Sequence, residues 1–366
     1  MSISLVYSIY VLNYINTLYI MFKVIYLWDY LKTAKKPIVL YGMGNGADKI
    51  ISVLESRGIE YRGVFATDGF VREKYFHGLK LSSYGELKEK FGDMIVLLCF
   101  GSARPEVLTN IKRIAAEQEL YAPDVPVYGR GLFTKKYASE HKKELEYVYN
   151  RLEDGLSRKT FENVVKYKIS GEIKYLLNCE ADINEPYNTF LKFGGDESYL
   201  DLGAYNGDTV LDFVSKVNDY NLITAVEPDK KSFLKLKRNT EKLERINLVN
   251  ACISDRTGFE SFSMRGGRNS SVGDGDKITA VTVDSLNPKT PFTYIKADVE
   301  GAEKTAIEGA EKTIKAYKPK MLISCYHRTE DLFSLPIAVD GIKNGYKLYL
   351  RHFSSLPAWE LNYYFI

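Results

Sequence analysis

Two stretches far apart in the chain share one pattern, a short apolar run followed by a glycine-rich turn and the start of a helix. The first is Ile38–Ala47 and the second is Ser198–Thr209. The pattern is typical of the opening of a parallel βαβ unit, because glycines allow a sharp turn and bring backbone N–H groups to the helix start. A chain of 366 residues that carries it twice is predicted to form two α/β domains.

The rest of the chain divides around these turns. We predict a Rossmann-like α/β domain over residues 21–135, a charged helical linker of two helices over 136–190, and a second α/β domain over 191–366. In this last part, apolar runs predict successive parallel strands. Closing strands at 346–351 and 361–366 predict a mostly parallel sheet with a reversed edge strand.

Apolar runs also place the elements of the first domain. They predict strands at 38–41, 61–65, 94–100 and 125–128, and Pro105 opens a predicted helix. Strands that alternate with helices in this way favour a small parallel sheet covered by helices.

Residues 1–20 form an uncharged segment that is long enough to cross a bilayer. Asn13, Asn16 and Thr17 make it polar for a membrane helix, and it has neither the basic region nor the cleavage site of a signal peptide. Three hypotheses remain: a membrane anchor, a packing helix, or an upstream translation with Met21 as the natural start. We favour the third.

Composition limits the class of partner. Fifty basic and forty-seven acidic residues are interspersed and give a net charge of +3, and no arginine-rich stripe indicates binding to nucleic acid. The four cysteines stand too far apart for a CxxC pair, and this usage is typical of the reducing cytoplasm. We therefore expect a cytoplasmic protein, and contact with a membrane stays open as an alternative through residues 1–22 alone.

The first glycine turn is a candidate nucleotide site. Gly42, Gly44 and Gly46 follow an apolar run, and Asp68 stands near the end of the next predicted strand, where a carboxylate can hold a ribose. The spacing from Gly42 to Asp68 is longer than the usual distance of about twenty residues. The alternative is a purely structural turn, since such turns also occur in domains that bind no nucleotide.

The second glycine turn carries more chemistry. Gly203 and Gly207 remove side chains where the backbone would pass close to a ligand, and N–H groups at the helix start would donate to a carboxylate. Asp201, at the strand end, is placed to accept a hydrogen bond from an ammonium group. Methionine carries both of these groups. The other residues of the turn complete the candidate site: Ala204, Tyr205, Asn206, Asp208 and Thr209.

Residues at the ends of the following strands extend this site. Glu227 ends the second strand before Pro228, and a carboxylate there is placed to accept hydrogen bonds from both hydroxyls of a ribose. Asn250 and Asp255 follow the third strand, where an adenine edge would be recognised. Asp298 ends the fourth strand, beside the position expected for the methyl group on the sulfur of a bound methionine derivative. The pattern therefore predicts a site for S-adenosylmethionine.

Four segments together resemble the FkbM-type methyltransferase family. The resemblance implies a seven-stranded class I methyltransferase fold that uses S-adenosylmethionine to methylate an oxygen of a sugar, a glycan or a related natural product. The first domain lies outside it and resembles, more weakly, Rossmann-like domains appended to some sugar-modifying proteins. The segments are YLDLGAYNGDT (199–209), AVEPD (225–229), YIKADVEGAE (294–303) and SCYHRTEDL (324–332).

Methyl transfer to a hydroxyl requires an aligned acceptor and a group that takes its proton. Asp298 and His327, at two predicted strand ends, are the candidate bases, and Glu300 is a further catalytic candidate. Lys296 and Arg328 are candidate contacts to an anionic substrate or an oxyanion. Each of these residues also has a purely structural alternative. Asp298 would cap the following helix, Glu300 would be a solvent-exposed acid in its first turn, and His327 would be a histidine at a strand end with its hydrogen bonds made within the protein.

Several alternatives stay open. A divalent metal held by Asp298 and Glu300 suits hard carboxylate oxygens, but the prediction is a site without metal. For the polar loop 263–277 there are two hypotheses: it closes over the bound acceptor, or it is a hairpin loop without a role in binding. Two other functions compete with methyl transfer to a small-molecule or glycan acceptor. One is an NAD- or nucleotide-sugar-binding enzyme centred on residues 42–47, and the other is a non-catalytic protein that senses S-adenosylmethionine.

Overall fold

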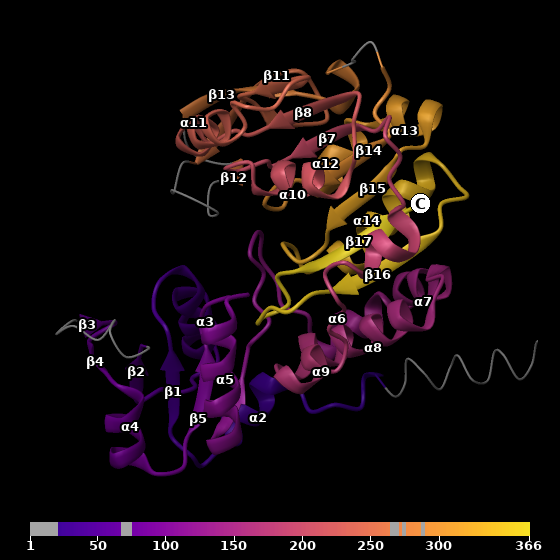
Figure 1. Cartoon of the computed structure of the whole chain (residues 1–366). Coiled ribbons are helices and arrows are strands. Elements are labelled where there is room, and N and C mark those ends of the chain that lie inside the picture. The colour runs from indigo at the N-terminus through magenta and orange to yellow at the C-terminus, as the bar shows by residue number, and fades with distance from the viewer. Residues whose placement is uncertain (1–20, 67–74, 264–270, 273–275, 287–289) are drawn as a thin grey trace, which may run out of the picture.

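The computed structural model describes residues 21–66, 75–263, 271–272, 276–286 and 290–366. Figure 1 shows an indigo-to-purple α/β unit, an orange-to-yellow α/β unit, and a row of magenta helices beside them. The hypotheses on residues 1–20 and on Asp68 lie outside the described residues.

The first unit is built on a six-stranded sheet in the order β3-β4-β2-β1-β5-β6. The buried strand β1 (Ile38–Tyr41) pairs in parallel with both β2 and β5, so the chain reverses its winding direction beside β1. The other elements are α2 (Leu27–Thr33), α3 (Asn45–Ser56), β2 (Gly63–Phe65), β3 (Tyr75–Phe76), β4 (Leu79–Ser82), α4 (Tyr84–Phe91), β5 (Ile95–Leu98), α5 (Pro105–Glu117) and β6 (Glu119–Tyr121).

The strand predicted at 125–128 is wrong, because the sixth strand is β6 and the residues after it run irregularly. Pro123 and Pro126 interrupt the apolar run, and proline has no N–H to donate to a sheet. Instead, the Pro126 carbonyl accepts a hydrogen bond from Lys49, and the Tyr128 N–H donates to the His327 carbonyl over 2.8 Å. This segment therefore joins the two units.

The linker contains more helices than the two predicted. Asp154 caps the longest of them, and Gly171 ends it in a left-handed conformation with φ of 67°. Helix α8 then packs on strand β16 (Leu348–His352) of the second unit, which anchors the linker to that sheet. The helices are α6 (Lys135–Glu140), α7 (Lys142–Arg151), α8 (Gly155–Ser170) and α9 (Ile173–Leu177), followed by the short η1 (Tyr187–Leu191).

The second unit is a seven-stranded sheet in the order β16-β17-β15-β14-β7-β8-β9. Strand β17 runs antiparallel between β15 and β16, and the other neighbouring strands pair in parallel. The predicted α/β class, with two Rossmann-like sheets and a reversed strand in the second, is confirmed, and the reversed strand lies next to the edge strand β16. The strands are β7 (Ser198–Leu202), β8 (Leu222–Val226), β9 (Ile246–Val249), β14 (Tyr294–Ala297), β15 (Lys320–Ser324), β16 (Leu348–His352) and β17 (Leu361–Phe365).

Helices and a small second sheet surround this core. The apolar spacing after Gly301 predicts one helix, but the structure has two, separated at Gly309, where an added Cβ would lie 2.3 Å from the Ser254 carbonyl oxygen. The described residues of the loop 263–277 belong to the small sheet. The helices are α10 (Asp208–Lys216), α11 (Lys230–Asn239), η3 (Val283–Ser285), α12 (Glu303–Glu308), α13 (Glu311–Tyr317) and α14 (Asp331–Ile342), and the small sheet contains β10 (Cys252–Ile253), β11 (Gly258–Ser263), β12 (Ser271–Val272) and β13 (Asp276–Val281).

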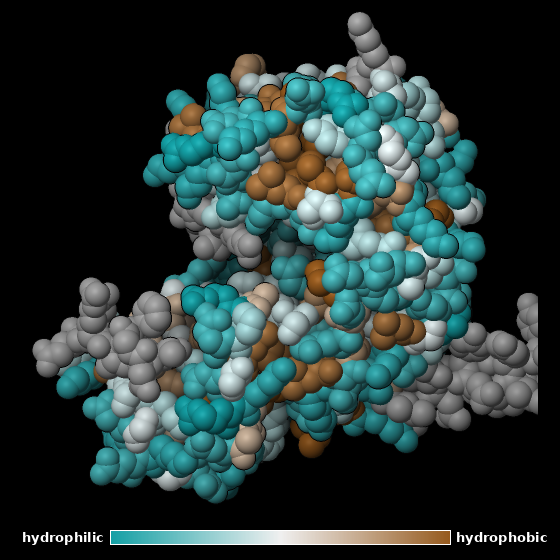
Figure 2. All heavy atoms as spheres, in the orientation of Figure 1, coloured by the Kyte–Doolittle hydropathy of each residue, from teal (hydrophilic) through white to brown (hydrophobic). Residues whose placement is uncertain are grey.

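The two units share one hydrophobic core, which continues from the first sheet through the linker helices to the second sheet. Ser102 and Leu356 exchange backbone hydrogen bonds of 2.9 and 3.0 Å across the junction. Gly101 packs so closely that an added Cβ would lie 2.2 Å from the Trp359 ring. Figure 2 shows a largely hydrophilic outer face, with apolar side chains gathered on the upper unit around the place where Figure 1 draws α10.

Among the described residues, we find no helix with the length and hydropathy needed to span a bilayer.

Candidate active site

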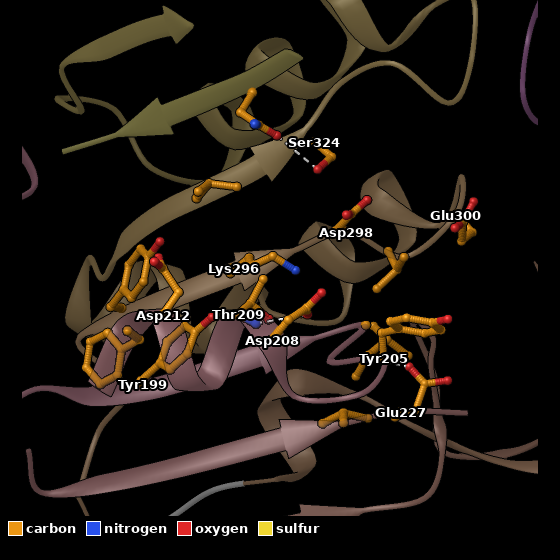
Figure 3. A pocket seen from close by; sticks show the side chains of 18 of the residues that line it. Tyr199, Tyr205, Asp208, Thr209, Asp212, Glu227, Lys296, Asp298, Glu300 and Ser324 are labelled. Atoms are coloured by element: carbon orange, nitrogen blue, oxygen red, sulfur yellow. Dashed lines mark hydrogen bonds between the residues drawn. The ribbon is translucent and has the colours of Figure 1, made fainter. Parts of the chain in front are cut away.

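A cavity of about 290 Å³ opens at the carboxyl ends of β7, β8 and β14, where parallel α/β sheets usually bind their ligands. Figure 3 shows Lys296 in the middle of this cavity, with Tyr199 and Asp212 toward one end and Tyr205 and Glu227 toward the other. We call these the aromatic end and the Glu227 end. The predicted site residues that line the cavity are Gly203, Tyr205, Asp208, Thr209, Glu227, Pro228, Lys296, Asp298 and Glu300.

Glu227 ends β8 with its carboxylate held by backbone donors. One oxygen accepts a hydrogen bond from the Tyr205 N–H over 2.8 Å, and the other accepts from the Asp229 N–H over 2.7 Å. Burial raises the pKa of Glu227 to about 7. Each carboxylate oxygen has a further lone pair, so the group suits a ligand that donates two adjacent hydroxyls.

The glycines of the turn between β7 and α10 mainly allow close contacts within the protein. Gly203 has φ of 79°, and a Cβ there would lie 1.9 Å from the Asp298 carbonyl oxygen, so glycine lets the ends of β7 and β14 meet. Gly207 also has a positive φ and packs against Leu236. Ala204, Asn206 and Gly207 do not line the cavity.

Asp201 lies beneath the cavity and is fully buried. One of its oxygens is 3.3 Å from the Lys296 ammonium nitrogen, and the other accepts a hydrogen bond from the Thr209 hydroxyl. Both oxygens therefore serve protein groups, and Lys296 separates Asp201 from the cavity. Asp208 and Asp298 are the carboxylates that line the cavity around Lys296.

The two residues predicted to recognise adenine lie outside the cavity. The Asn250 amide donates to the carbonyls of Glu227 and Pro228 over 2.8 and 3.1 Å and so fixes the turn after β8. Asp255 is exposed at the surface. The wall at this place is formed by residues 251–253, which the sequence analysis did not select, although their apolar run directly after the predicted third strand was a usable signal.

Asp298 ends β14 and carries a negative charge. Burial alone would raise its pKa, but the charges of Lys296 and His327 and a hydrogen bond from Tyr326 hold the pKa below its ordinary value. The Tyr326 hydroxyl donates to Asp298 over 3.1 Å. The pKa of Lys296, which burial would lower, is raised by Asp201 and Asp298. An ionised carboxylate and an ammonium group therefore lie side by side at the cavity wall.

His327 follows β15 and is completely buried behind this wall. Its Nδ1 lies 2.8 Å from Glu303 Oε1, and its Nε2 lies 3.6 Å from Asp298 Oδ1 and 3.5 Å from Glu300 Oε2. Burial would lower the pKa of His327, but these carboxylates raise it to about 10. Since His327 does not line the cavity and holds its proton at neutral pH, the geometry favours Asp298 as the base.

The predicted contact Arg328 also points away from the cavity. Its Nε donates to the Gly301 carbonyl over 2.6 Å, and its guanidinium stacks on the Tyr128 ring at 4.3 Å. An added Cβ at Gly301 would lie 2.8 Å from Tyr128 Cβ. The first unit therefore braces the turn that carries Asp298 and Glu300.

The aromatic end was not predicted. The Tyr199 and Tyr294 rings stack with centroids 5.0 Å apart, and the Tyr187 hydroxyl donates to Asp212 over 3.1 Å. These rings come from strands, a helix and the linker, so no local sequence pattern marks them as a set. The aromatic lining residues are Tyr187, Tyr199, Phe213, Tyr294, Phe353 and Tyr364.

Residues of the first unit pack closely against two glycines of the first glycine turn. An added Cβ at Gly42 would lie 2.5 Å from the Phe100 ring, and one at Gly46 would lie 2.3 Å from the Cys99 carbonyl oxygen. Gly44 faces open space. The crevice beside Gly46 has a volume of about 40 Å³, enough for a few waters only. The described residues thus give Gly42 and Gly46 a structural reason, and the nucleotide site at this turn stays a prediction.

Comparison with known proteins agrees with this arrangement. Residues 201–347 match the family model of the methyltransferase FkbM domain. No curated protein sequence matches the chain. The structure resembles methyltransferase FkbM from Methylobacillus flagellatus KT, with a TM-score of 0.72 and 19% identity over 97% of this chain and 98% of that one. At this identity the likeness shows the shared fold, which includes the first unit.

Other solved structures match only part of the chain. An rRNA methylase from Streptococcus thermophilus has a TM-score of 0.32 and 11% identity, over 47% of this chain and 87% of that one. This score is too low to support an argument. The family match and the seven-stranded sheet together imply binding of S-adenosylmethionine. Within the C-terminal half of the chain, residues 201–347 are therefore a methyltransferase domain of the FkbM family.

Proposed function

We propose that the protein transfers a methyl group from S-adenosylmethionine to a hydroxyl group of a sugar, a glycan or a related natural product. The observation that carries this proposal is the order of groups along one cavity. A carboxylate suited to a ribose lies at the Glu227 end, the ionised Asp298 lies beside Lys296 in the middle, and aromatic rings line the far end.

The Glu227 end suits the nucleoside of the donor. The Glu227 carboxylate would accept hydrogen bonds from both ribose hydroxyls, and the apolar wall at residues 251–253 would pack against adenine. Asp208, which lines the cavity at the start of α10, would accept a hydrogen bond from the ammonium group of the methionine part. When bound, S-adenosylmethionine supplies an electrophilic methyl group on a positively charged sulfur.

The aromatic end suits a sugar or a comparable hydroxylated ring. Such molecules present apolar C–H faces and hydroxyl edges, so they pack on aromatic rings and donate hydrogen bonds to carboxylates. Tyr199 and Tyr294 supply ring surface, and Asp212 and Glu360 supply acceptors on the cavity wall. An acceptor seated there would direct a hydroxyl toward the middle of the cavity.

In the middle of the cavity, Asp298 would take the proton of the acceptor hydroxyl. It is ionised, and the Tyr326 hydroxyl donates to it and fixes its orientation. The ammonium group of Lys296 would stabilise negative charge that develops on the acceptor oxygen. The remaining contribution is alignment of the acceptor with the methyl group.

The test is transfer of a labelled methyl group to a panel of sugars, nucleotide sugars and glycans, with amines of similar size alongside. We expect label in hydroxylated acceptors and a rate at least about tenfold lower in Asp298→Asn, as is usual for loss of a general base. Asp255→Asn is the matched control, because that exposed carboxylate lies outside the cavity. Transfer to amines alone, or an unchanged rate in Asp298→Asn, would overturn the proposal.

A further inference from the structure

A cluster of metal-ligating side chains lies behind the wall of the cavity. Asp298, Glu303 and His327 each offer one ligand atom, and these atoms lie within 4.8 Å of one another. Both Glu303 and His327 are fully buried. Glu303 Oε2 and both ring nitrogens of His327 make no hydrogen bond of good geometry within the described part of the chain. Buried polar atoms of this kind normally have a partner.

The carboxylate of Glu303 determines how His327 presents its ring. Glu303 Oε1 accepts hydrogen bonds from the Val299 and Gly301 N–H groups over 3.0 and 3.3 Å, so its position is fixed by backbone. It lies 2.8 Å from His327 Nδ1. A carboxylate beside one ring nitrogen orients the ring and leaves the other nitrogen to ligate a metal, as in many metal sites.

The other ring nitrogen faces two more carboxylates. His327 Nε2 lies 3.6 Å from Asp298 Oδ1 and 3.5 Å from Glu300 Oε2. Two carboxylate oxygens this close to one ring nitrogen require a positive charge among them, which either a proton on Nε2 or a metal cation that replaces this proton would supply. Asp298 and Glu300 also line the cavity, so such a cation would be reached from the cavity side.

The turn that carries Glu300 has a strained backbone that neighbouring residues hold in place. Glu300 has a positive φ of 53°, which is unfavourable for a residue with a side chain. The adjacent Gly301 is wedged against Tyr128, and Arg328 donates to its carbonyl. The turn is thereby kept in the conformation that directs Glu300 toward His327.

We propose that His327 Nε2, Asp298 and Glu300 bind one divalent first-row transition-metal cation, with Glu303 as the residue that positions His327. One imidazole and two carboxylates form a mixed nitrogen and oxygen donor set that suits Mn²⁺ and its neighbours. The cation at this wall would bind the oxygen of the acceptor hydroxyl. That last role rests on the proposed function, whereas binding of the cation does not.

The experiment is a titration of the metal-stripped full chain with Mn²⁺ at neutral pH, followed by the electron paramagnetic resonance signal of free Mn²⁺. We expect one site. Glu300→Gln should weaken it at least about tenfold, and so should His327→Gln, because each removes a ligand. Glu308→Gln is the matched control, since this exposed glutamate is on the neighbouring helix α12 outside the cluster.

The outcomes separate this proposal from the proposed function. If His327→Gln does not fold, Glu300→Gln still decides, because Glu300 is partly exposed and its loss leaves no buried charge unpaired. Absence of a wild-type site would overturn the cation proposal, and so would equal loss in Glu300→Gln and Glu308→Gln. In that case His327 is a protonated partner of the three carboxylates. Methyl transfer is measured separately, so its failure would leave a measured Mn²⁺ site intact.

Discussion

The two glycine turns begin alike and end differently. In each, a glycine lets the chain approach the carbonyl at the end of a neighbouring strand: Gly46 meets Cys99 after β5, and Gly203 meets Asp298 after β14. In the first unit the next residue, Phe100, packs against Gly42, and the crevice beside Gly46 has a volume of only about 40 Å³. In the second unit the same place opens into a cavity of about 290 Å³. The glycine pattern therefore specifies how strands meet, and the residue on the neighbouring strand decides whether a ligand fits.

The charges around the two turns differ as well. The second turn lies beside Glu227, whose pKa burial raises to about 7, and beside the ionised Asp298. The first turn lies beside Cys99, a thiol whose pKa burial raises well above its ordinary value, so it stays neutral. Ionisable groups with perturbed pKa values in a cleft are typical of active sites, which is why the second turn is the better candidate.

The largest expected effect comes from adding a methyl group at the close contacts. Gly203→Ala would place Cβ 1.9 Å from the Asp298 carbonyl oxygen, so we expect a loss of more than about 4 kcal/mol in the free energy of unfolding and no binding of S-adenosylmethionine. Gly46→Ala should also destabilise the protein, yet folded protein should retain binding. Gly44 faces open space, so Gly44→Ala should cost only the backbone strain of its φ of 97° and ψ of −162°, about 1–3 kcal/mol. Urea denaturation and calorimetry measure both quantities, and loss of binding in folded Gly46→Ala would contradict the comparison.

The next effect concerns the carboxylate at the second turn. Glu227→Gln should weaken binding of S-adenosylmethionine about 30-fold or more, because hydrogen bonds to a charged acceptor contribute about 1.5–3 kcal/mol each. Calorimetric titration gives the affinity. Asp255→Asn should bind as the wild type does, since Asp255 lies outside the cavity. Equal affinities in wild type and Glu227→Gln would remove the ribose contact from the proposal.

A smaller effect is expected from pH. Because burial raises the pKa of Glu227 to about 7 and the ligand hydroxyls need the ionised form, the affinity for S-adenosylmethionine should fall as pH decreases below 7, at most about tenfold per unit. The raised pKa also means that ionised Glu227 opposes folding. Its contribution should therefore make the wild type less stable at pH 8 than at pH 5.5 relative to Glu227→Gln. Thermal melts and titrations across this range check both signs, and identical profiles in the two proteins would refute them.

The smallest effect belongs to the first turn. NADH and nucleotide sugars should show no binding to the wild type at micromolar concentration, because Phe100 packs against Gly42 and the crevice beside Gly46 has a volume of only about 40 Å³. Phe100→Ala should leave the affinity for S-adenosylmethionine unchanged within about twofold, as expected for distant and independent sites. Fluorescence titration with NADH provides the measurement. Tight binding to the wild type would show that the two turns are alike in function after all.

Much of the fold could be predicted because apolar runs between turns mark parallel strands. Every predicted strand of the second sheet is present within a few residues, and the predicted helix at Pro105 is confirmed. The strand at 125–128 failed because Pro126, inside the run, has no N–H to donate to a ladder of hydrogen bonds. The small sheet of β10 to β13 was not predicted, because its polar residues resemble a loop in sequence.

The sequence predicts which strand ends carry the site residues, but not how deeply each side chain is buried. Sequence places Glu227, Asp298 and His327 at strand ends, and the structure brings Glu227 and Asp298 to one cavity. Whether a side chain at a strand end faces a cavity or lies beneath it depends on what packs above it. Lys296 covers Asp201, and Asp298 and Glu300 stand before His327. These relations join segments that are distant in sequence, so no local pattern reveals them.

The brace between Tyr128, Gly301 and Arg328 has a consequence for protein engineering. The turn that presents Asp298 and Glu300 is supported on its outer side by residues from the first unit. A methyltransferase domain excised at residue 191 would keep every cavity-lining group except Ile183 and Tyr187, but it would lose that support. Excision at residue 191 would also remove Asp154 and Glu185, the partners of the buried Arg351. A functional graft onto another protein would therefore have to carry residues 123–131 and the linker helices along with the second unit.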